Sequence, residues 1–150
     1  MFIVGIRKDL GFTFEFPKPL EGDFQTRVLR DVIGDLPEPE RQDCGKYWTP
    51  KSEYTYGQAN RVQSLDKPSN TIPAHHNSGQ PIQPIHPTEA PRRFTVRECL
   101  RIQSAPDTYV LPDDISLSAQ YRIVGNGIAS RVAWYIGCAL ADQLRFKSKA

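Results

Sequence analysis

Hydrophobic and polar residues follow different patterns in the first part of the chain, and each pattern predicts an element. Residues 2–7 form a short, continuous apolar run that is typical of a buried strand. Over 12–16, three phenylalanines alternate with polar residues, which predicts an extended segment with its rings on a core. Residues 26–36 place apolar residues at helical spacing after Thr26, a good N-cap residue, and predict a helix. A domain seldom opens on a buried strand, so we expect further sequence upstream.

The pattern becomes irregular over residues 40–93. Seven of the 13 prolines lie between Pro50 and Pro91, and long periodic runs are absent. Aromatic residues such as Tyr47 and Trp48 are frequent, whereas flexible linkers are poor in aromatics. We therefore expect loops on short strands in this region.

Regular spacing returns at Thr95. The stretch from Thr95 to Glu98 is a capping box, in which each side chain bonds the backbone of the other residue. It predicts the start of a helix over 95–104, and Pro106 lies just beyond the end of that helix.

The last part of the chain predicts two more helices. A short one begins at Ser116 or Ser118 and runs to Tyr121, and Gly125-Asn126-Gly127 predicts a tight turn after it. Residues 128–140 then repeat apolar positions at i, i+4, i+7 and i+8, which predicts a helix whose apolar face packs on another element.

Length and charge narrow the possible classes of protein. A chain of 150 residues is one ordinary domain, and a net charge of +2 is too small for nucleic-acid binding by bulk charge alone. No apolar stretch is long enough to span a membrane, and the first residues lack the form of a signal peptide. These features predict a cytoplasmic protein.

The three cysteines are Cys44, Cys99 and Cys138, and their wide spacing argues against a disulfide framework or a zinc ribbon. Cys99 and Cys138 lie within helical patterns and are expected to be small core residues, while Cys44 lies in a loop. No pairing of a nucleophile with a base is evident.

The histidines do not form a metal motif. His75 and His76 are adjacent rather than four residues apart, and neither they nor His86 have a suitably spaced Cys or carboxylate. We predict no metal site, and we expect the paired histidines to form hydrogen bonds from a loop.

Three blocks of sequence together resemble one family, the DNA (cytosine-5) methyltransferases. Residues 1–9 resemble the end of its motif VIII, residues 93–107 resemble motif IX, and residues 121–129 resemble motif X. The resemblance implies an α/β fold: the C-terminal fragment of a Rossmann-like, S-adenosylmethionine-dependent methyltransferase, with its edge strand and final helix. A small, irregular, β-rich target-recognition domain would complete the chain.

The resemblance also implies a division of the chain into three parts. Residues 1–36 would end the catalytic domain, and residues 37–112 would form the target-recognition domain with the motif IX helix at 95–104. Residues 113–150 would hold motif X and the helix that returns to the catalytic domain.

The family's nucleophile lies in a Pro-Cys-Gln motif, and none of the three cysteines here has that context. The Phe-x-Gly-x-Gly loop and the Glu-Asn-Val motif of the family are also absent from the sequence. In the family a thiolate attacks C6 of a flipped cytosine and the methyl group is transferred to C5. We therefore predict no catalytic residue in this chain, no activity of the chain alone, and an N-terminal methyltransferase half or subunit as its partner.

The resemblance assigns roles to individual residues. Asn126 and Gly127 would border S-adenosylmethionine, and Thr71 would face a phosphate of double-stranded DNA. His75, His76 and Asn77 would contact bases or sugars, while Lys51, Arg61 and Lys67 would contact phosphates. A structural role is expected for three motif IX residues: Arg97, Glu98 and Gln103.

One position departs from the family, because relatives typically carry Phe where Ala105 stands. Such a loss leaves a hole unless neighbouring residues close in. Two alternatives to a working methyltransferase part stay open, a stand-alone DNA-binding module and an inactive truncated remnant. A small enzyme of another kind would need a set of catalytic residues that the sequence lacks.

Overall fold

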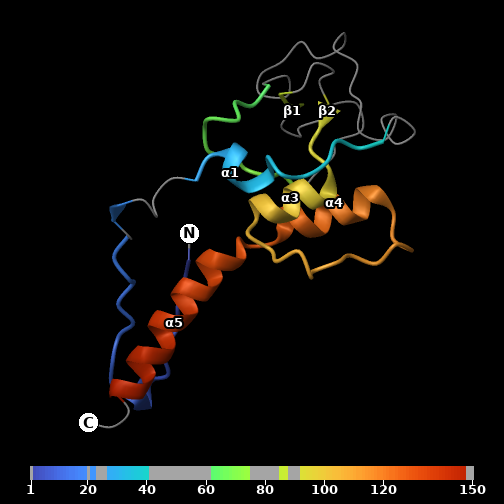
Figure 1. The fold of residues 1–150 in the computed structure, drawn as a ribbon. Coiled ribbons are helices and arrows are strands. Elements are labelled where there is room, and N and C mark those ends of the chain that lie inside the picture. Colours follow the sequence, from blue (N-terminus) through green and yellow to red (C-terminus); the bar gives the residue numbers. More distant parts are fainter. Residues whose placement is uncertain are drawn as a thin grey trace, which may run out of the picture.

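The computed structural model describes residues 2–19, 21–22, 27–40, 62–74, 85–87 and 92–147. Its elements are short except at the C-terminal end (Figure 1). In chain order they are η1 Lys8–Leu10, α1 Leu29–Ile33, β1 Ile85–His86, β2 Arg92–Arg93, α3 Val96–Ile102, α4 Leu117–Asn126 and α5 Ser130–Lys147.

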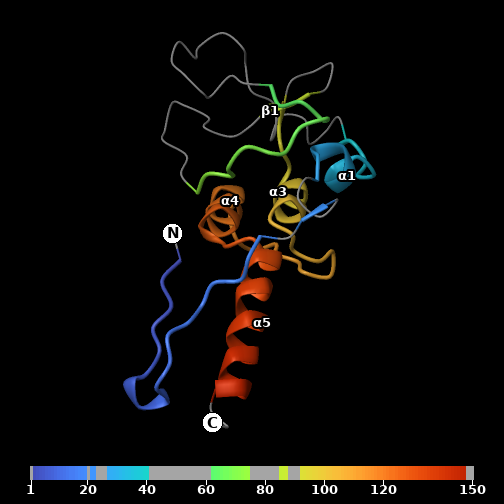
Figure 2. The same cartoon turned by 90° about the vertical axis from the view of Figure 1, so that its left-hand side faces the viewer.

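The core lies where α1, α3 and α4 meet. Helix α3 is in the middle and contacts α1 on one side and α4 on the other, as both Figure 1 and Figure 2 show. Phe94 and Tyr121 are fully buried there, and the Tyr121 hydroxyl donates a 2.5 Å hydrogen bond to the Phe94 carbonyl. The other buried apolar residues of this cluster are Leu29, Ile33, Ile72, Val96, Cys99, Leu100, Leu111 and Val124.

The capping box of α3 is confirmed. The Glu98 amide donates to the Thr95 hydroxyl at 3.1 Å, and the Thr95 amide donates to the Glu98 carboxylate at 2.6 Å. The helix ends at Ile102, earlier than predicted, because Ser104 takes a left-handed conformation with φ of 60°. That turn lets the amide of Ala105 donate to the Leu100 carbonyl at 2.9 Å.

Helix α4 is longer than predicted. Its N-cap is Ser116, whose hydroxyl accepts the Ala119 amide at 3.2 Å. The helix continues to Asn126, so the predicted tight turn over 125–127 is wrong for its first two residues. A glycine within a helix costs about 1 kcal/mol relative to alanine. Position 125 has no room for a side chain, because the backbone of Pro73 and Ala74 packs directly against it.

Helix α5 extends away from the core, and the N-terminal segment runs alongside it (Figures 1 and 2). The side-chain amide of Gln143 donates to the Glu15 carbonyl at 2.7 Å and its oxygen accepts the Glu15 amide at 3.0 Å. Near the other end of the helix, the Tyr135 hydroxyl donates to the Lys18 carbonyl at 2.9 Å. The apolar face predicted over 128–140 is only partly covered, since Val132 stays 42% exposed.

The predicted strand over residues 2–7 is wrong. These residues have no regular structure, and Ile3 is 84% exposed, because the described part of the chain offers them no strand to pair with. The phenylalanines over 12–16 run along α5 as an extended segment, but only Phe14 is buried.

The helix predicted over 26–36 is shorter in the structure. Helix α1 begins after Val28, whose amide donates to the Asp31 carboxylate at 3.2 Å, and ends at Ile33 with Gly34 as its C-cap. Thr26, the expected N-cap, lies outside the described residues.

The described sheet consists of β1 and β2, which pair antiparallel with Ile85 opposite Arg93 and His86 opposite Arg92. Of the region 37–112, which was expected to be β-rich, residues 41–61, 75–84 and 88–91 lie outside the described residues. The described part of the chain contains no Rossmann-like sheet. None of the described helices combines the length and the apolar character that crossing a membrane would need.

Candidate functional site

A buried ion pair joins β2 to α3. Two nitrogens of the Arg92 guanidinium each donate to one carboxylate oxygen of Glu98 at 2.9 Å, and Arg92 also donates to Glu38 at 2.9 Å. The Arg92 and Glu98 side chains are 7% and 3% exposed. Burial lowers the pKa of Arg92, but the hydrogen bonds that Arg92 donates to Glu98 and Glu38 outweigh it and raise that pKa overall. The pair fixes the short sheet on the first turn of α3.

His86 completes this cluster from β1. Its Nε2 lies 3.4 Å from a Glu98 carboxylate oxygen, and its ring packs edge-on against Phe94 with centroids 5.4 Å apart. The pKa of His86 is lowered, mainly because the side chain is buried and also because the positive charge of Arg92 is close. The charges of Glu98 and Glu38 act in the opposite direction but do not outweigh these effects. His86 is therefore held neutral at pH 7.

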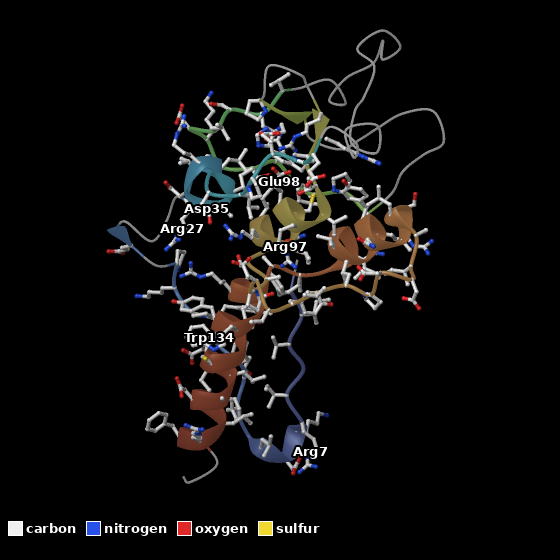
Figure 3. All side chains as sticks on the ribbon, turned by 45° about the vertical axis from the view of Figure 1, so that its right-hand side comes forward. Arg7, Arg27, Asp35, Arg97, Glu98 and Trp134 are labelled. Atoms are coloured by element: carbon white, nitrogen blue, oxygen red, sulfur yellow. The ribbon has the colours of Figure 1, made fainter. Side chains whose placement is uncertain are left out.

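Arg97 in α3 and Gln103, directly after it, are two of the predicted structural residues, and both form hydrogen bonds to neighbouring segments. Arg97 lies on the side of α3 away from Glu98 (Figure 3) and donates to the Tyr109 carbonyl at 3.0 Å. Gln103 donates from its side-chain amide to the Val124 carbonyl at 3.3 Å and accepts the Ser130 amide on its own carbonyl at 2.9 Å. Gln103 thus joins the end of α3 to the end of α4 and the start of α5.

The segment 62–74 presents two of the predicted DNA contacts. Its backbone is held against α1, because the Lys67 carbonyl accepts the Leu29 amide at 3.0 Å. The Lys67 and Thr71 side chains are exposed, while Ile72, next to Thr71, is buried in the core. A fixed backbone with exposed polar side chains is an arrangement suited to contacting a polyanion.

The end of α4 lies directly against this segment at Gly125. A Cβ atom on residue 125 would overlap the Pro73 carbonyl oxygen and the backbone nitrogen of Ala74. Only glycine permits this approach. The structure therefore brings Thr71, the predicted phosphate contact, into the neighbourhood of Asn126 and Gly127, the predicted cofactor contacts.

Asn126 and Gly127 form the exposed end of α4. Among the described residues the side-chain amide of Asn126 has no hydrogen-bond partner, so it is available to a ligand. The Gly127 amide is already used, since it donates to the carbonyls of Ile123 and Val124 at 3.1 Å each. A ligand at this turn would therefore meet the Asn126 amide and the carbonyl of Gly127.

Several predicted DNA contacts lie outside the described residues: Lys51, Arg61, His75, His76 and Asn77. Cys44, which was expected in a loop, also lies outside them. Sequence reasoning missed the roles of Gly125, Arg92 and His86. The sequence Gly125-Asn126-Gly127 predicts a turn, although its first two residues belong to α4. The network of Arg92 and His86 left no local signal, because its members interact across three separate segments.

Cys99 is fully buried, and burial, assisted by the charge of Glu98, raises the pKa of its thiol. A protonated, buried thiol fits a core role rather than a nucleophile. Cys138 is half-buried in α5. Within the described ranges, no three His, Cys, Asp or Glu side chains gather closely enough to hold a metal ion.

Comparison with known proteins identifies the class. The model of the family "C-5 cytosine-specific DNA methylase" matches residues 1–142. The type II methyltransferase M.MthTI of Methanothermobacter thermautotrophicus is 37% identical in an alignment 161 residues long. That alignment covers 89% of this chain and 48% of the relative. M.FnuDI of Fusobacterium nucleatum is 30% identical over 99% of this chain and 52% of its own length.

The chain therefore belongs to the C-5 cytosine-specific DNA methylase family. Methylases of this family depend on S-adenosylmethionine. The chain spans about half the length of these two relatives, 48% of M.MthTI and 52% of M.FnuDI.

The same matches overturn the prediction that the chain is the C-terminal part of such an enzyme. The family model covers residues 1–142, and the two relatives align over 89% and 99% of the chain, which assigns it to the catalytic region. The division at residues 36 and 112 stays a prediction.

Proposed function

We propose that this chain acts within a DNA (cytosine-5) methyltransferase, where it contacts double-stranded DNA and forms one wall of the S-adenosylmethionine pocket. The observation that supports the division of roles is the approach of Gly125 to Pro73 and Ala74. This backbone contact joins the segment 62–74, which carries expected DNA contacts, to the end of α4, which carries the expected cofactor contacts. The nucleophilic cysteine and the Glu that binds the target base would come from methyltransferase sequence outside these 150 residues. That sequence would be a separate segment or a separate subunit, and both parts would act in the cytoplasm.

The residues at the end of α4 fit one side of the cofactor. The amide of Asn126 can donate to and accept from the polar groups of an adenosine, and the exposed Gly127 leaves room for a ligand to approach the backbone. S-adenosylmethionine supplies the methyl group when it is bound. Gln103 acts on this site indirectly, because its two hydrogen bonds set where α4 ends and α5 begins.

On the DNA side, Lys67 and Thr71 would contact phosphates together with Lys51 and Arg61. His75, His76 and Asn77 would follow Thr71 into the groove and contact base edges or sugars. Arg97 and Glu98 would hold the DNA-contacting segments in place rather than touch DNA.

Complementation tests this proposal. The purified chain is mixed with a methyltransferase segment that carries the Phe-x-Gly-x-Gly and Pro-Cys-Gln motifs, and transfer of labelled methyl groups to duplex DNA is measured. We expect no transfer by either piece alone and transfer by the mixture. Activity of the isolated chain that persists after Cys44, Cys99 and Cys138 are all replaced by Ser would contradict the proposal.

A second arm of the experiment separates binding from catalysis. Asn126→Ala in the chain should raise the KM for S-adenosylmethionine in the mixture and leave duplex binding unchanged. If every mixture binds DNA but none transfers methyl groups, the chain is a DNA-binding module or an inactive remnant.

A further inference from the structure

A cavity of about 380 Å³ lies between α1, the turn after α3 and the first turns of α5. Much of its lining is apolar, and three hydroxyl-bearing side chains also line it: Ser69, Ser104 and Tyr135. Trp134, on the first part of α5, forms one wall and is 70% exposed. Arg27 and Trp134 lie on the same side of the molecule in Figure 3.

Three arginines from distant parts of the chain line this cavity: Arg27, Arg101 and Arg131. Arg101 is neutralised, because Asp107 accepts two hydrogen bonds from it at 2.8 Å and Asp35 accepts a third at 2.5 Å. By contrast, within the described part of the chain neither Arg27 nor Arg131 has an acidic partner. Both are exposed at the rim, so two guanidinium groups that form no ion pair among the described residues face one opening, while Asp31 and Asp107 line the adjoining cavity with them.

The cavity is continuous with the segment of the expected phosphate contacts. Ser69 lies in its lining, two residues from Lys67 on one side and two from Thr71 on the other. An opening with exposed cations at its rim suits the backbone of a polymer that passes across it better than a small ligand that must be enclosed.

We propose that Arg27 and Arg131 bind a backbone phosphate of double-stranded DNA at this cavity, beside Lys67 and Ser69. The inference rests on the proposed function and adds two residues, from segments outside 37–112, to the surface that contacts DNA. Arginine presents a planar fork of donors that matches phosphate oxygens. The Ser69 hydroxyl already donates to the Asn70 carbonyl at 2.8 Å, so the two guanidinium groups are the donors offered to the phosphate.

The test measures binding of the full chain to a fluorescent duplex of about 20 base pairs while the salt concentration rises from about 50 to about 200 mM. The Arg27→Gln/Arg131→Gln variant is compared with Arg122→Gln/Arg145→Gln. The control variant removes the same two charges from exposed residues that do not line the cavity. Arg27→Lys/Arg131→Lys keeps the charge and serves as the conservative rescue.

We expect the slope of log K against log salt to fall in magnitude by about 0.9 in the cavity variant, because the contact with one phosphate contributes about 0.9. The control variant should keep the wild-type slope, and the lysine variant should recover most of it. The weakening should be the same for every DNA sequence, since phosphate contacts carry no base information. Equal slopes in the cavity and control variants would overturn the inference while leaving the proposed function intact.

Two further results would count against it. If wild-type chain fails to bind duplex DNA at any salt concentration, the proposed function and this inference both fail. If the cavity variant weakens binding of inorganic phosphate but not of DNA, the cavity holds a small anion instead, and if it weakens binding of S-adenosylmethionine but not of DNA, the cavity belongs to the cofactor site. In a Trp48→Phe background, the emission of Trp134 should change on addition of duplex and should stop responding when Arg27 and Arg131 are replaced.

Discussion

Gly125 and Ala74 are in backbone contact, and a side chain at residue 125 would overlap the Ala74 nitrogen. The two residues lie in different elements, α4 and the segment that follows Ile72. Because Ile72 is buried in the core, the segment has little freedom to move away. The contact therefore fixes the distance between the exposed Thr71 and the exposed end of α4.

Gly125→Ala should lower the free energy of unfolding by about 1–3 kcal/mol, because backbone atoms rather than a flexible side chain would have to move. Urea unfolding of both proteins measures the difference. Gly137→Ala is the matched control, since a Cβ at that position of α5 would meet nothing within 4 Å. The control should gain about 0.5–1 kcal/mol from helix propensity. If Gly125→Ala is as stable as its control, the close contact with Ala74 does not exist.

Glu98→Gln should destabilise the protein by about 3–5 kcal/mol, because it leaves the charge of Arg92 buried without its main partner. The loss should appear as a lower urea midpoint with an unchanged slope. Arg30→Gln breaks an exposed ion pair with Asp66, 2.9 Å long, and serves as the comparison. It should cost less than about 1 kcal/mol. Equal effects of the two substitutions would show that the Arg92–Glu98 pair is not buried in solution.

The stability of the fold should fall as the pH drops below 6.5, the ordinary pKa of histidine, because the pKa of His86 is lowered in the folded state. Between that lowered value and 6.5 the unfolded chain binds more protons, so the free energy of unfolding rises with pH across this window. Urea midpoints measured between about pH 5 and about pH 8 should show this slope. His86→Gln should remove the His86 contribution. A variant with the same slope as wild type would assign the pH dependence to other groups.

Ala105 borders a cavity of about 270 Å³, which it shares with Arg27, Arg101 and Arg131. A phenylalanine at this position has space to enter, so Ala105→Phe should raise stability by up to about 1.5 kcal/mol or leave it unchanged. Thermal unfolding of the variant measures the effect. A loss of more than about 1 kcal/mol would mean that the turn after α3 cannot admit a ring.

Local sequence signals predicted the elements whose stabilising contacts are also local. Thr95 and Glu98 bond each other's backbone within one helical turn, so the start of α3 follows from four consecutive residues. The helical period over 128–140 likewise predicted α5, although not its full length. The family resemblance identified the class of enzyme correctly but not the part of it.

The amino-acid sequence by itself determined the helices α3 and α5, the burial of Cys99 and the membership of the methylase family. Tertiary structure decided that residues 2–7 form no strand, because a strand needs a partner that its own sequence cannot provide. It also decided that Gly125 belongs to helix α4 instead of a turn and packs against another segment, since the atoms that it contacts belong to Pro73 and Ala74. Arg27, Ser69 and Arg131 meet at one cavity only after folding, because no spacing along the chain encodes a contact between segments so far apart.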